Sequence, residues 1–247
     1  TISVSEKEGI HLKSNLVYLP NDKRNLVYKA AALFMEANSL DCGLEINLNK
    51  RIPVSAGLAG GSSDAAATLK GLNRLFKSGM TDAQLMQLGV KCGADVPYCI
   101  MLGTALSEGI GEKLTALPPM PDCFILLVKP DISVSTKHVY ESLRLNDETI
   151  HPDINAMKEA LKASDLEALC AKMANLLESV TIPMHPVIAD IKRDMMKQGA
   201  MASLMSGSGP TVFGIFRSKD LADKAYAYFK ANYRHAKQVF LTKPYYP

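Results

Sequence analysis

The chain has 247 residues and a formal net charge of +3, and its hydrophobic and charged fractions of 47% and 21% are ordinary for a globular protein. The small, dispersed positive charge argues against nucleic acid as a partner, and no apolar run approaches the roughly 20 residues that cross a bilayer. The five cysteines are odd in number and form no CxxC pair, which favours free thiols in a reducing, cytoplasmic compartment.

The first part of the chain alternates predicted strands and helices. Hydrophobic periodicity and turn residues define these elements. They are short strands over 1–18, a helix over 20–38, a strand over 43–52, a helix that Gly79 ends, and a helix that begins with a capping box at Thr81–Gln84. The order of strands and helices predicts an α/β protein.

A glycine-rich stretch, P-V-S-A-G-L-A-G-G-S-S-D-A-A-A over residues 53–67, connects the strand over 43–52 to the next helix. Gly57, Gly60 and Gly61 allow positive φ and close approach of a ligand, and Ser62 or Ser63 can cap the helix. Unpaired N–H groups and the helix dipole together suit a phosphate. The other interpretation is a tight turn before an ordinary helix.

The spacing of this loop differs from two common phosphate motifs. No lysine follows Gly61, so the loop is not a Walker A motif, and the glycines do not form G-x-G-x-x-G. Negative charge on a phosphate would therefore be met by backbone amides, by the hydroxyls of Ser62 and Ser63, and by a metal such as Mg²⁺.

Asp95 is an isolated carboxylate in the otherwise apolar segment that follows Gly93. One interpretation is a cap or turn residue that accepts hydrogen bonds from local amides. The other is a base that accepts a proton from a substrate hydroxyl during phosphoryl transfer.

The second part of the chain contains a proline-rich linker and a second glycine-rich turn. The linker covers residues 117–121, and the turn is Ser206–Pro210, which is either a plain β-turn or a turn whose amides approach a phosphate. The other expected elements are a hairpin over 105–117, a buried strand over 123–128, a helix capped by Ser135 or Thr136, helices over 153–178 and 187–199, strands over 202–205 and 212–216, a helix over 220–232 and a strand over 238–242.

Three motifs, residues 53–67, Gly93–Pro97 and Met205–Pro210, occur in an order that resembles the GHMP kinases, the superfamily named after galactokinase, homoserine, mevalonate and phosphomevalonate kinases. The likeness covers nearly the whole chain. It is strongest to the members that phosphorylate the 2-hydroxyl of 4-diphosphocytidyl-2-C-methyl-D-erythritol in the non-mevalonate route to isoprenoids. The resemblance implies a two-domain α/β (α+β) fold, with an ATP-binding domain like domain 2 of ribosomal protein S5 over 1–120 and a ferredoxin-like domain over 121–247.

The resemblance also implies the roles of individual residues. ATP with Mg²⁺ would be bound by Pro53, Val54, Ser55, Ala56, Gly57, Leu58, Ala59, Gly60, Gly61, Ser62 and Ser63, and the Ser62 or Ser63 hydroxyl would contact the metal. Asp95 matches the catalytic base of these kinases. The substrate would be bound by Asp95, Thr136, Tyr140, Gly207, Ser208 and Gly209, with the Tyr140 ring facing the base; a half-buried helix aromatic is the other interpretation of Tyr140.

The start of the chain differs from the family pattern. Members open with a strand bearing an A-K-I-N-L-type motif, followed by a D-G-Y-H segment, whereas this chain begins at Thr1 and contains neither. We therefore expect an N-terminal segment with its lysine to be missing, and neither Lys13 nor Lys50 has a local sequence that would replace that lysine. Another small-molecule kinase of the family and a non-catalytic nucleotide-binding module remain alternative functions, and the sequence does not determine the oligomeric state.

Overall fold

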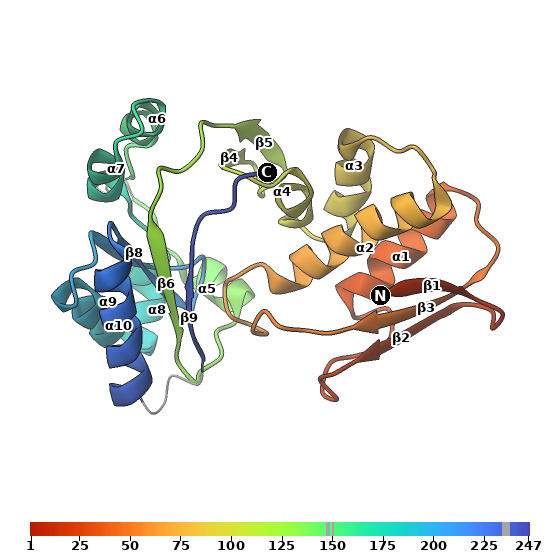
Figure 1. Ribbon diagram of the computed structural model, residues 1–247, viewed down its shortest axis with the longest axis horizontal. Helices are drawn as coiled ribbons and strands as arrows, with labels where there is room; N and C mark the ends of the chain where they lie inside the picture. The colour runs from red at the N-terminus through yellow and green to blue at the C-terminus, as the bar shows by residue number, and fades with distance from the viewer. Residues whose placement is uncertain (147–148, 150, 234–237) are drawn as a thin grey trace. The chain divides into compact units, whose positions relative to one another are not determined.

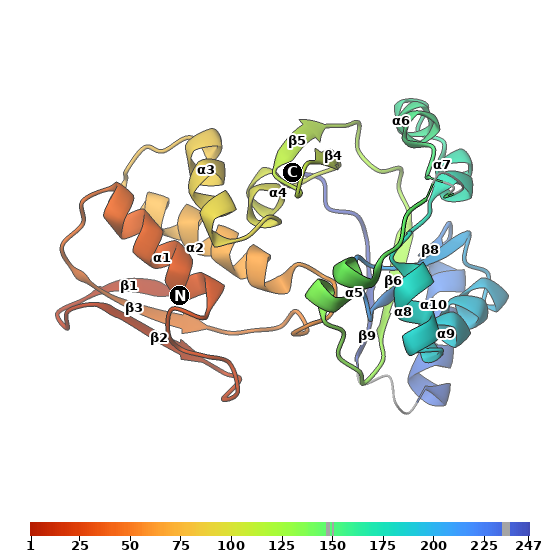
Figure 2. The same ribbon diagram turned by 180° about the vertical axis from the view of Figure 1, so that it is seen from behind.

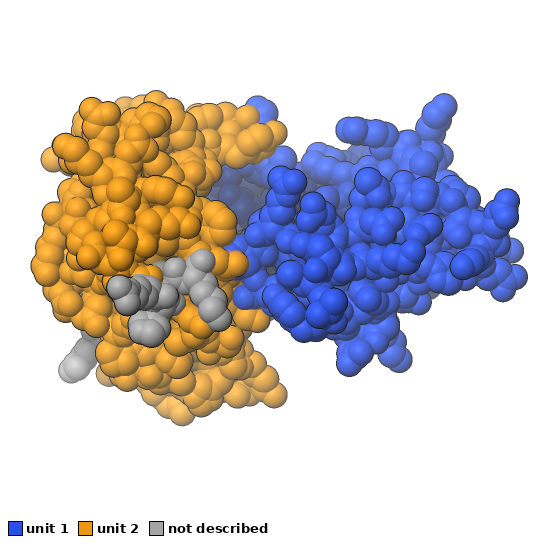
Figure 3. Space-filling view, turned by 60° about the horizontal axis from the view of Figure 1, so that its bottom comes forward, with its two compact units in different colours: residues 1–54, 59–116, 247 blue, residues 55–58, 117–246 orange. Residues whose placement is uncertain are grey.

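The computed structural model describes residues 1–146, 149, 151–233 and 238–247 (Figure 1). These residues form two compact units, which Figure 3 shows in blue and orange. Unit 1 comprises Thr1–Val54, Ala59–Ala116 and Pro247, and unit 2 comprises Ser55–Leu58 and Leu117–Tyr246. The short segment Ser55–Leu58 therefore belongs to unit 2, although the residues on both sides of it belong to unit 1.

Unit 1 is built on a three-stranded sheet of β1 (Ile2–Ser5), β2 (Ile10–Ser14) and β3 (Gly43–Leu48) in the order β1-β3-β2. The central strand β3 is antiparallel to β1 and parallel to β2. Two helices, α1 (Leu26–Ala37) and α2 (Gly60–Phe76), cover one face of this sheet (Figures 1 and 2). Phe34, Leu44 and Leu69 are fully buried between the helices and the sheet, where their apolar area stabilises the unit.

The remaining elements of unit 1 follow the predicted order with shifted boundaries. Helix α1 begins after Asn25, whose side chain accepts a hydrogen bond from the Val27 N–H, so the predicted start at 20 was six residues too early. The capping box of α3 (Asp82–Cys92) is confirmed at Thr81. Short helix α4 (Val96–Met101) follows, and then the predicted hairpin of β4 (Ala105–Glu108) and β5 (Lys113–Ala116).

Unit 2 contains a four-stranded antiparallel sheet in the order β7-β8-β6-β9. Its strands are β6 (Phe124–Lys129), β7 (Ala202–Met205), β8 (Val212–Phe216) and β9 (Gln238–Thr242). Helices α9 (Val187–Lys197) and α10 (Lys219–Asn232) pack on the sheet, with Phe216 and Phe229 fully buried (Figures 1 and 2).

Four shorter helices complete unit 2: α5 (Thr136–Ser142), α6 (Ile154–Lys162), α7 (Leu166–Lys172) and α8 (Glu178–Met184). Of the two predicted caps of α5, Ser135 is the cap, because its side chain accepts the His138 N–H, and Thr136 is the first helical residue. The mixed class of helix and sheet is confirmed. All five cysteines are free thiols, and within the described ranges no helix is long and apolar enough to cross a membrane.

Two buried threonines of unit 2 provide a test of its packing. Thr211 Oγ1 has no hydrogen-bond partner among the described residues, whereas Thr181 Oγ1 donates to Ser208 O at 3.3 Å, and both residues are fully buried. We expect Thr211→Val to leave the free energy of unfolding unchanged or to raise it by about 1 kcal/mol, because a buried hydroxyl without a partner is lost. Thr181→Val should lower it by about 1–2 kcal/mol, because Ser208 O loses its donor. Urea unfolding measures both, and a larger loss for Thr211→Val than for Thr181→Val would contradict this account.

Candidate active site

The N-terminus of α2 carries unpaired backbone N–H groups. Ala59 is the N-cap residue, and the first helical hydrogen bond runs from Ser63 N to Ala59 O at 2.8 Å. The N–H groups of Gly60, Gly61 and Ser62 make no hydrogen bond within the described part of the chain. Three unpaired amides at the positive end of a 17-residue helix are geometrically able to donate to an anion.

Two predictions about this loop were wrong. Ser62 and Ser63 do not cap α2, because the helix already begins at Gly60 and has no side-chain cap. Their hydroxyls make no hydrogen bond among the described residues, so they are available to a ligand. Positive φ occurs at Gly57 as predicted, but the other left-handed residues of the loop are Ser55 (φ 51°) and Ala59 (φ 47°) rather than Gly60 and Gly61.

Gly60 is required by close packing rather than by its φ angle. A Cβ atom there would lie 2.7 Å from Ile52 Cγ2 and 2.8 Å from Lys50 Nζ. At Gly61 a Cβ atom would meet only Leu26 Cδ1, at 3.3 Å. The first turn of α2 is therefore pressed against the chain that leads out of β3.

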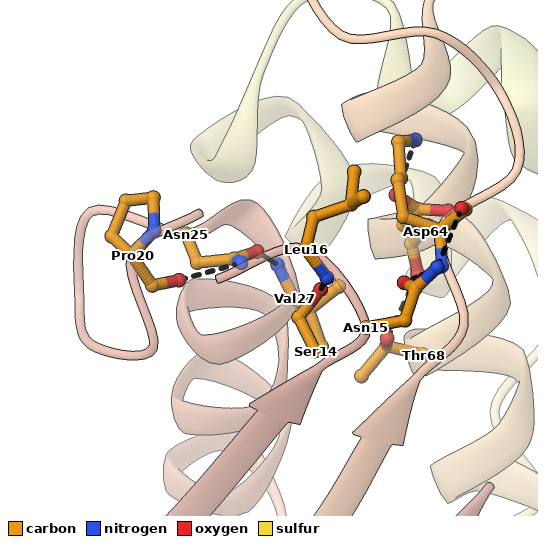
Figure 4. A network of polar contacts seen from close by, with 9 residues as sticks. Ser14, Asn15, Leu16, Pro20, Asn25, Val27, Asp64 and Thr68 are labelled. Atoms are coloured by element: carbon orange, nitrogen blue, oxygen red, sulfur yellow. Dashed lines mark hydrogen bonds and ion pairs between the residues drawn. The ribbon is translucent and has the colours of Figure 1, made fainter. Parts of the chain in front are cut away.

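Lys50 forms a buried ion pair beneath this turn. Its side chain is only 4% exposed, and Nζ donates to Asp64 Oδ2 at 2.6 Å. Asn15 fixes the Lys50 backbone on both sides, since it accepts from Lys50 N at 2.7 Å and donates to Lys50 O at 3.2 Å. Thr68 Oγ1 donates to Asp64 O within α2 at 2.8 Å, and Figure 4 shows these side chains. The network connects the segment after β3 to the first turns of α2.

The sequence analysis did not assign a role to the Lys50–Asp64 pair. Lys50 was considered only as a replacement for a catalytic lysine, and its bonded partner lies 14 residues away on the next helix. One signal was available, namely a lysine that lies two residues after the end of β3 and precedes a loop without any lysine. A buried pair of this kind is strongly destabilised when one partner is removed, because the other charge stays buried and uncompensated.

Asp95 occupies the N-cap position of α4, but its side chain makes no capping hydrogen bond. The residue is exposed, and its carboxylate forms no ion pair among the described residues. The capping interpretation required bonds to local amides, and the geometry does not provide them. The carboxylate is thus available to accept a proton from a ligand.

The thiol of Cys99 in unit 1 has a raised pKa, and two carboxylates contribute to it. The pKa of its thiol is raised to about 11, first by burial and then by the negative charges of Asp95 and Asp64. A negative charge disfavours the thiolate, so the ionised carboxylates add to the effect of burial on this pKa.

In unit 2, the segment Ser55–Leu58 packs against the second glycine-rich turn, Ser206–Pro210. Ser206 Oγ donates to Gly57 O at 2.8 Å, and Thr211 N donates to Ala56 O at 3.4 Å. A Cβ atom on Gly57 would lie 2.3 Å from Ser206 O. The structure therefore brings together parts of two glycine-rich motifs that lie about 150 residues apart in the sequence.

Of the predicted substrate residues of unit 2, Thr136, Gly207, Ser208 and Gly209 lie at this turn. Thr136 Oγ1 and Ser208 Oγ share a hydrogen bond of 2.8 Å, and Gly207 and Gly209 both have positive φ. Tyr140 lies one helical turn after Thr136 on α5 and is 61% exposed, so the interpretation as a half-buried aromatic was wrong.

A metal ion would find few protein ligands here. Among the described residues no group of three or more His, Cys, Asp and Glu side chains could hold one. A divalent cation at the α2 N-terminus would therefore take most of its oxygen ligands from phosphate groups and water, with a serine hydroxyl as the protein ligand. The unpartnered hydroxyls of Ser62 and Ser63 fit that arrangement.

Gly57 and Gly61 provide a matched test of the loop geometry. Gly57→Ala should lower the free energy of unfolding by about 2 kcal/mol or more, because φ is 70° and the new methyl group would clash with Ser206 O. Gly61→Ala should be neutral or stabilising by up to about 1 kcal/mol, because alanine favours a helix and finds room. Urea unfolding of both variants measures the difference, and equal effects would show that the two motifs are not packed as described.

The thiol of Cys99 provides a second test. Asp95→Asn removes a nearby negative charge, so the pKa of Cys99 should fall and alkylation by iodoacetamide should become faster at a given pH between 8 and 11. Asp82→Asn, a carboxylate exposed at the start of α3, should leave the rate unchanged. Mass spectrometry of the Cys99 peptide measures the rate, and an unaltered pH profile in Asp95→Asn would place Asp95 away from the thiol.

Comparisons with known proteins point to one kinase family. The family model for the GHMP kinase N-terminal domain matches residues 25–103, and the model for the GHMP kinase C-terminal domain matches residues 157–235. The chain is 53% identical to the 4-diphosphocytidyl-2-C-methyl-D-erythritol kinase of Lachnoclostridium phytofermentans over 98% of its own length and 83% of the relative. It is 48% identical to the protein of that name from Clostridium novyi, over 96% of its own length and 84% of the relative.

Solved structures agree with this family. A crystal structure of 4-(cytidine 5′-diphospho)-2C-methyl-D-erythritol kinase matches with a TM-score of 0.80 and 30% identity, covering 98% of this chain and 84% of that one. A homoserine kinase from Cytophaga hutchinsonii matches with a TM-score of 0.83 over 99% of this chain and 84% of that one, but at 21% identity it supports the fold alone. The two-domain fold predicted from the motifs is confirmed.

Proposed function

The chain belongs to the GHMP kinase family, and we propose that it phosphorylates the 2-hydroxyl group of 4-diphosphocytidyl-2-C-methyl-D-erythritol with ATP. This reaction is a step of the non-mevalonate route to isoprenoid precursors. The observation that carries the proposal is the 53% identity over 98% of the chain with a kinase of that name. The free thiols of all five cysteines fit a reducing, cytoplasmic location.

In this proposal residues 1–120 form the ATP-binding domain and residues 121–247 the C-terminal domain. The triphosphate is bound by residues 53–63, with the unpaired amides of Gly60, Gly61 and Ser62 as donors. The Ser62 or Ser63 hydroxyl would hold Mg²⁺, which would neutralise charge on the phosphates. Because no lysine is present in the loop, the amides and hydroxyls supply all of the loop's contribution to phosphate binding.

Asp95 acts as the general base. The oxygen of the 2-hydroxyl group forms a bond to the γ-phosphorus of ATP, the bond between this phosphorus and the β–γ bridging oxygen breaks, and Asp95 takes the hydroxyl proton. ADP leaves with the bridging oxygen. The uncapped, exposed carboxylate of Asp95 supports this role. Most of the rate enhancement comes from alignment and from charge stabilisation by oriented amides, since phosphoryl transfer needs little covalent participation.

The substrate is bound by Asp95, by Thr136 and Tyr140 of α5, and by Gly207, Ser208 and Gly209. The exposed ring of Tyr140 offers an aromatic face to the cytosine base, and the hydroxyl pair of Thr136 and Ser208 offers polar contacts to the diphosphate or the polyol. The shared hydrogen bond fixes both hydroxyls before a ligand arrives, which reduces the entropy lost on binding.

The test is substrate-dependent release of ADP by this chain, compared with Asp95→Asn and with Asp82→Asn as a matched surface variant. Removal of the base should lower kcat by about 10²–10⁴-fold while nucleotide affinity, measured by calorimetry, stays close to that of the original chain. Asp82→Asn should leave kcat unchanged.

Homoserine and mevalonate serve as competing substrates in the same assay. Faster turnover of either would replace the proposed substrate with another alcohol. Binding of ATP without turnover of any alcohol would indicate a non-catalytic nucleotide-binding module instead.

A further inference from the structure

In the turn Ser206–Pro210, several carbonyl groups are hydrogen-bonded, whereas two N–H groups have no partner among the described residues. Three of its carbonyl groups are bonded within unit 2, since Ser206 O accepts from Gly209 N, Gly207 O from Asn175 Nδ2, and Ser208 O from Thr181 Oγ1. The N–H groups of Gly207 and Ser208, in contrast, make no hydrogen bond within the described ranges. Two adjacent unpaired amides in a turn with positive φ at Gly207 form a site for an anion.

Asn175 uses its whole amide group to fix this turn. Its Nδ2 donates to Met205 O and to Gly207 O, both at 2.8 Å, and its Oδ1 accepts from Leu177 N at 3.0 Å. The two carbonyls that it binds lie at the start of the turn, just beyond the end of β7. One side chain thereby determines where the chain leaves the strand.

Glu178 fixes the other side of Met205. Its Oε1 accepts from Met205 N at 2.7 Å, and its Oε2 forms an ion pair with Lys192 of α9. The Glu178 side chain is only 15% exposed, and Lys192 compensates its charge. Asn175, Glu178 and Thr181 follow one another at a spacing of three residues, so α8 and the residue three positions before it present all three side chains to the turn.

We propose that Asn175, Glu178 and Thr181 are positioning residues that hold the turn's carbonyls in place, so that the Gly207 and Ser208 N–H groups are presented to a phosphate group of a bound ligand. This inference rests on the proposed kinase function. A turn that contains two glycines has access to many backbone conformations, so its amides face a ligand only if the turn is held in one of them. Donors that are oriented before the ligand arrives need no reorganisation when charge develops on the phosphate.

Asn175→Asp is the decisive variant, because it keeps the size of the side chain and the bond to Leu177 N. It removes both donors and places a carboxylate beside Met205 O and Gly207 O. Asn232→Asp is the matched control, since Asn232 Nδ2 also donates to a backbone carbonyl, Tyr228 O at 2.9 Å, but on exposed α10. We expect kcat to fall about tenfold or more in Asn175→Asp, with KM values changed less than kcat, and both to stay constant in Asn232→Asp.

Glu178 tests whether the hydrogen bond or the charge matters. Glu178→Gln keeps an oxygen that accepts from Met205 N, so it should retain most of kcat, whereas Glu178→Leu should lose as much as Asn175→Asp. A loss in Glu178→Gln as large as in Glu178→Leu would overturn the positioning role of this side chain, because the charge pair with Lys192 alone would then matter.

Amide NMR signals provide a measurement that does not depend on turnover. In the original chain, the Gly207 and Ser208 N–H signals should shift on addition of the ATP analogue with a β,γ-imido bridge or of the cytidine diphosphate substrate, and these shifts should shrink in Asn175→Asp but not in Asn232→Asp. Absence of the shifts with both ligands in the original chain, or equal shifts in both variants, would overturn the inference. If the original chain binds nucleotide without turnover, the proposed function fails while the amide shifts still decide this inference.

Discussion

Backbone N–H groups without protein partners are the feature on which both glycine-rich motifs depend. Every helix start leaves backbone N–H groups without an intrahelical partner, and side chains, water or a ligand must satisfy them. In this chain they occur at Gly60, Gly61 and Ser62 in unit 1 and at Gly207 and Ser208 in unit 2. Among the described residues, no side chain caps these amides at the α2 N-terminus, and at the second turn side chains bond the neighbouring carbonyls but not the amides.

The Lys50–Asp64 pair explains how the first of these sites stays suited to an anion. Asp64 lies in the second turn of α2, where an uncompensated carboxylate would oppose a phosphate at the helix N-terminus. Lys50 pairs with it at 2.6 Å in a nearly buried position, so the two charges cancel close to the site. At the short distance and reduced dielectric constant of a buried pair, this attraction exceeds that of a surface pair by severalfold. The pair thus connects the fold of unit 1 to the electrostatics of its loop.

Local sequence patterns predicted the elements of this fold well and the loop geometry less well. The capping box at Thr81, a cap at Ser135 or Thr136 and the hairpin over 105–117 were all predicted, because short-range hydrogen bonds and periodicity determine them. The left-handed conformations of Ser55 and Ala59 were missed, because positive φ is uncommon for residues other than glycine. The uncapped start of α2 at Gly60 was missed because a serine near a helix start normally caps it.

The residues around the second turn were missed for a related reason. Asn175 and Glu178 precede and begin a short helix, where both residue types are common, so their local sequence indicated only an ordinary helix start. Their bonds to Met205 and Gly207 span about 30 residues and depend on how β7 and α8 pack in unit 2. Two polar residues within a largely apolar stretch were the one available signal.

Asp95 shows how an unsatisfied local preference can indicate function. Aspartate at an N-cap position normally accepts a hydrogen bond from the first helical turn, which stabilises a protein by about 1 kcal/mol. Asp95 occupies that position on α4 without making the bond, so its carboxylate does not contribute that stability. A position where the structure departs from a local sequence preference, with no compensating gain in stability, is expected to be functional. A carboxylate that acts as a base for a substrate hydroxyl needs an oxygen without a hydrogen bond. The Asp95 side chain makes no capping hydrogen bond, so it meets this requirement.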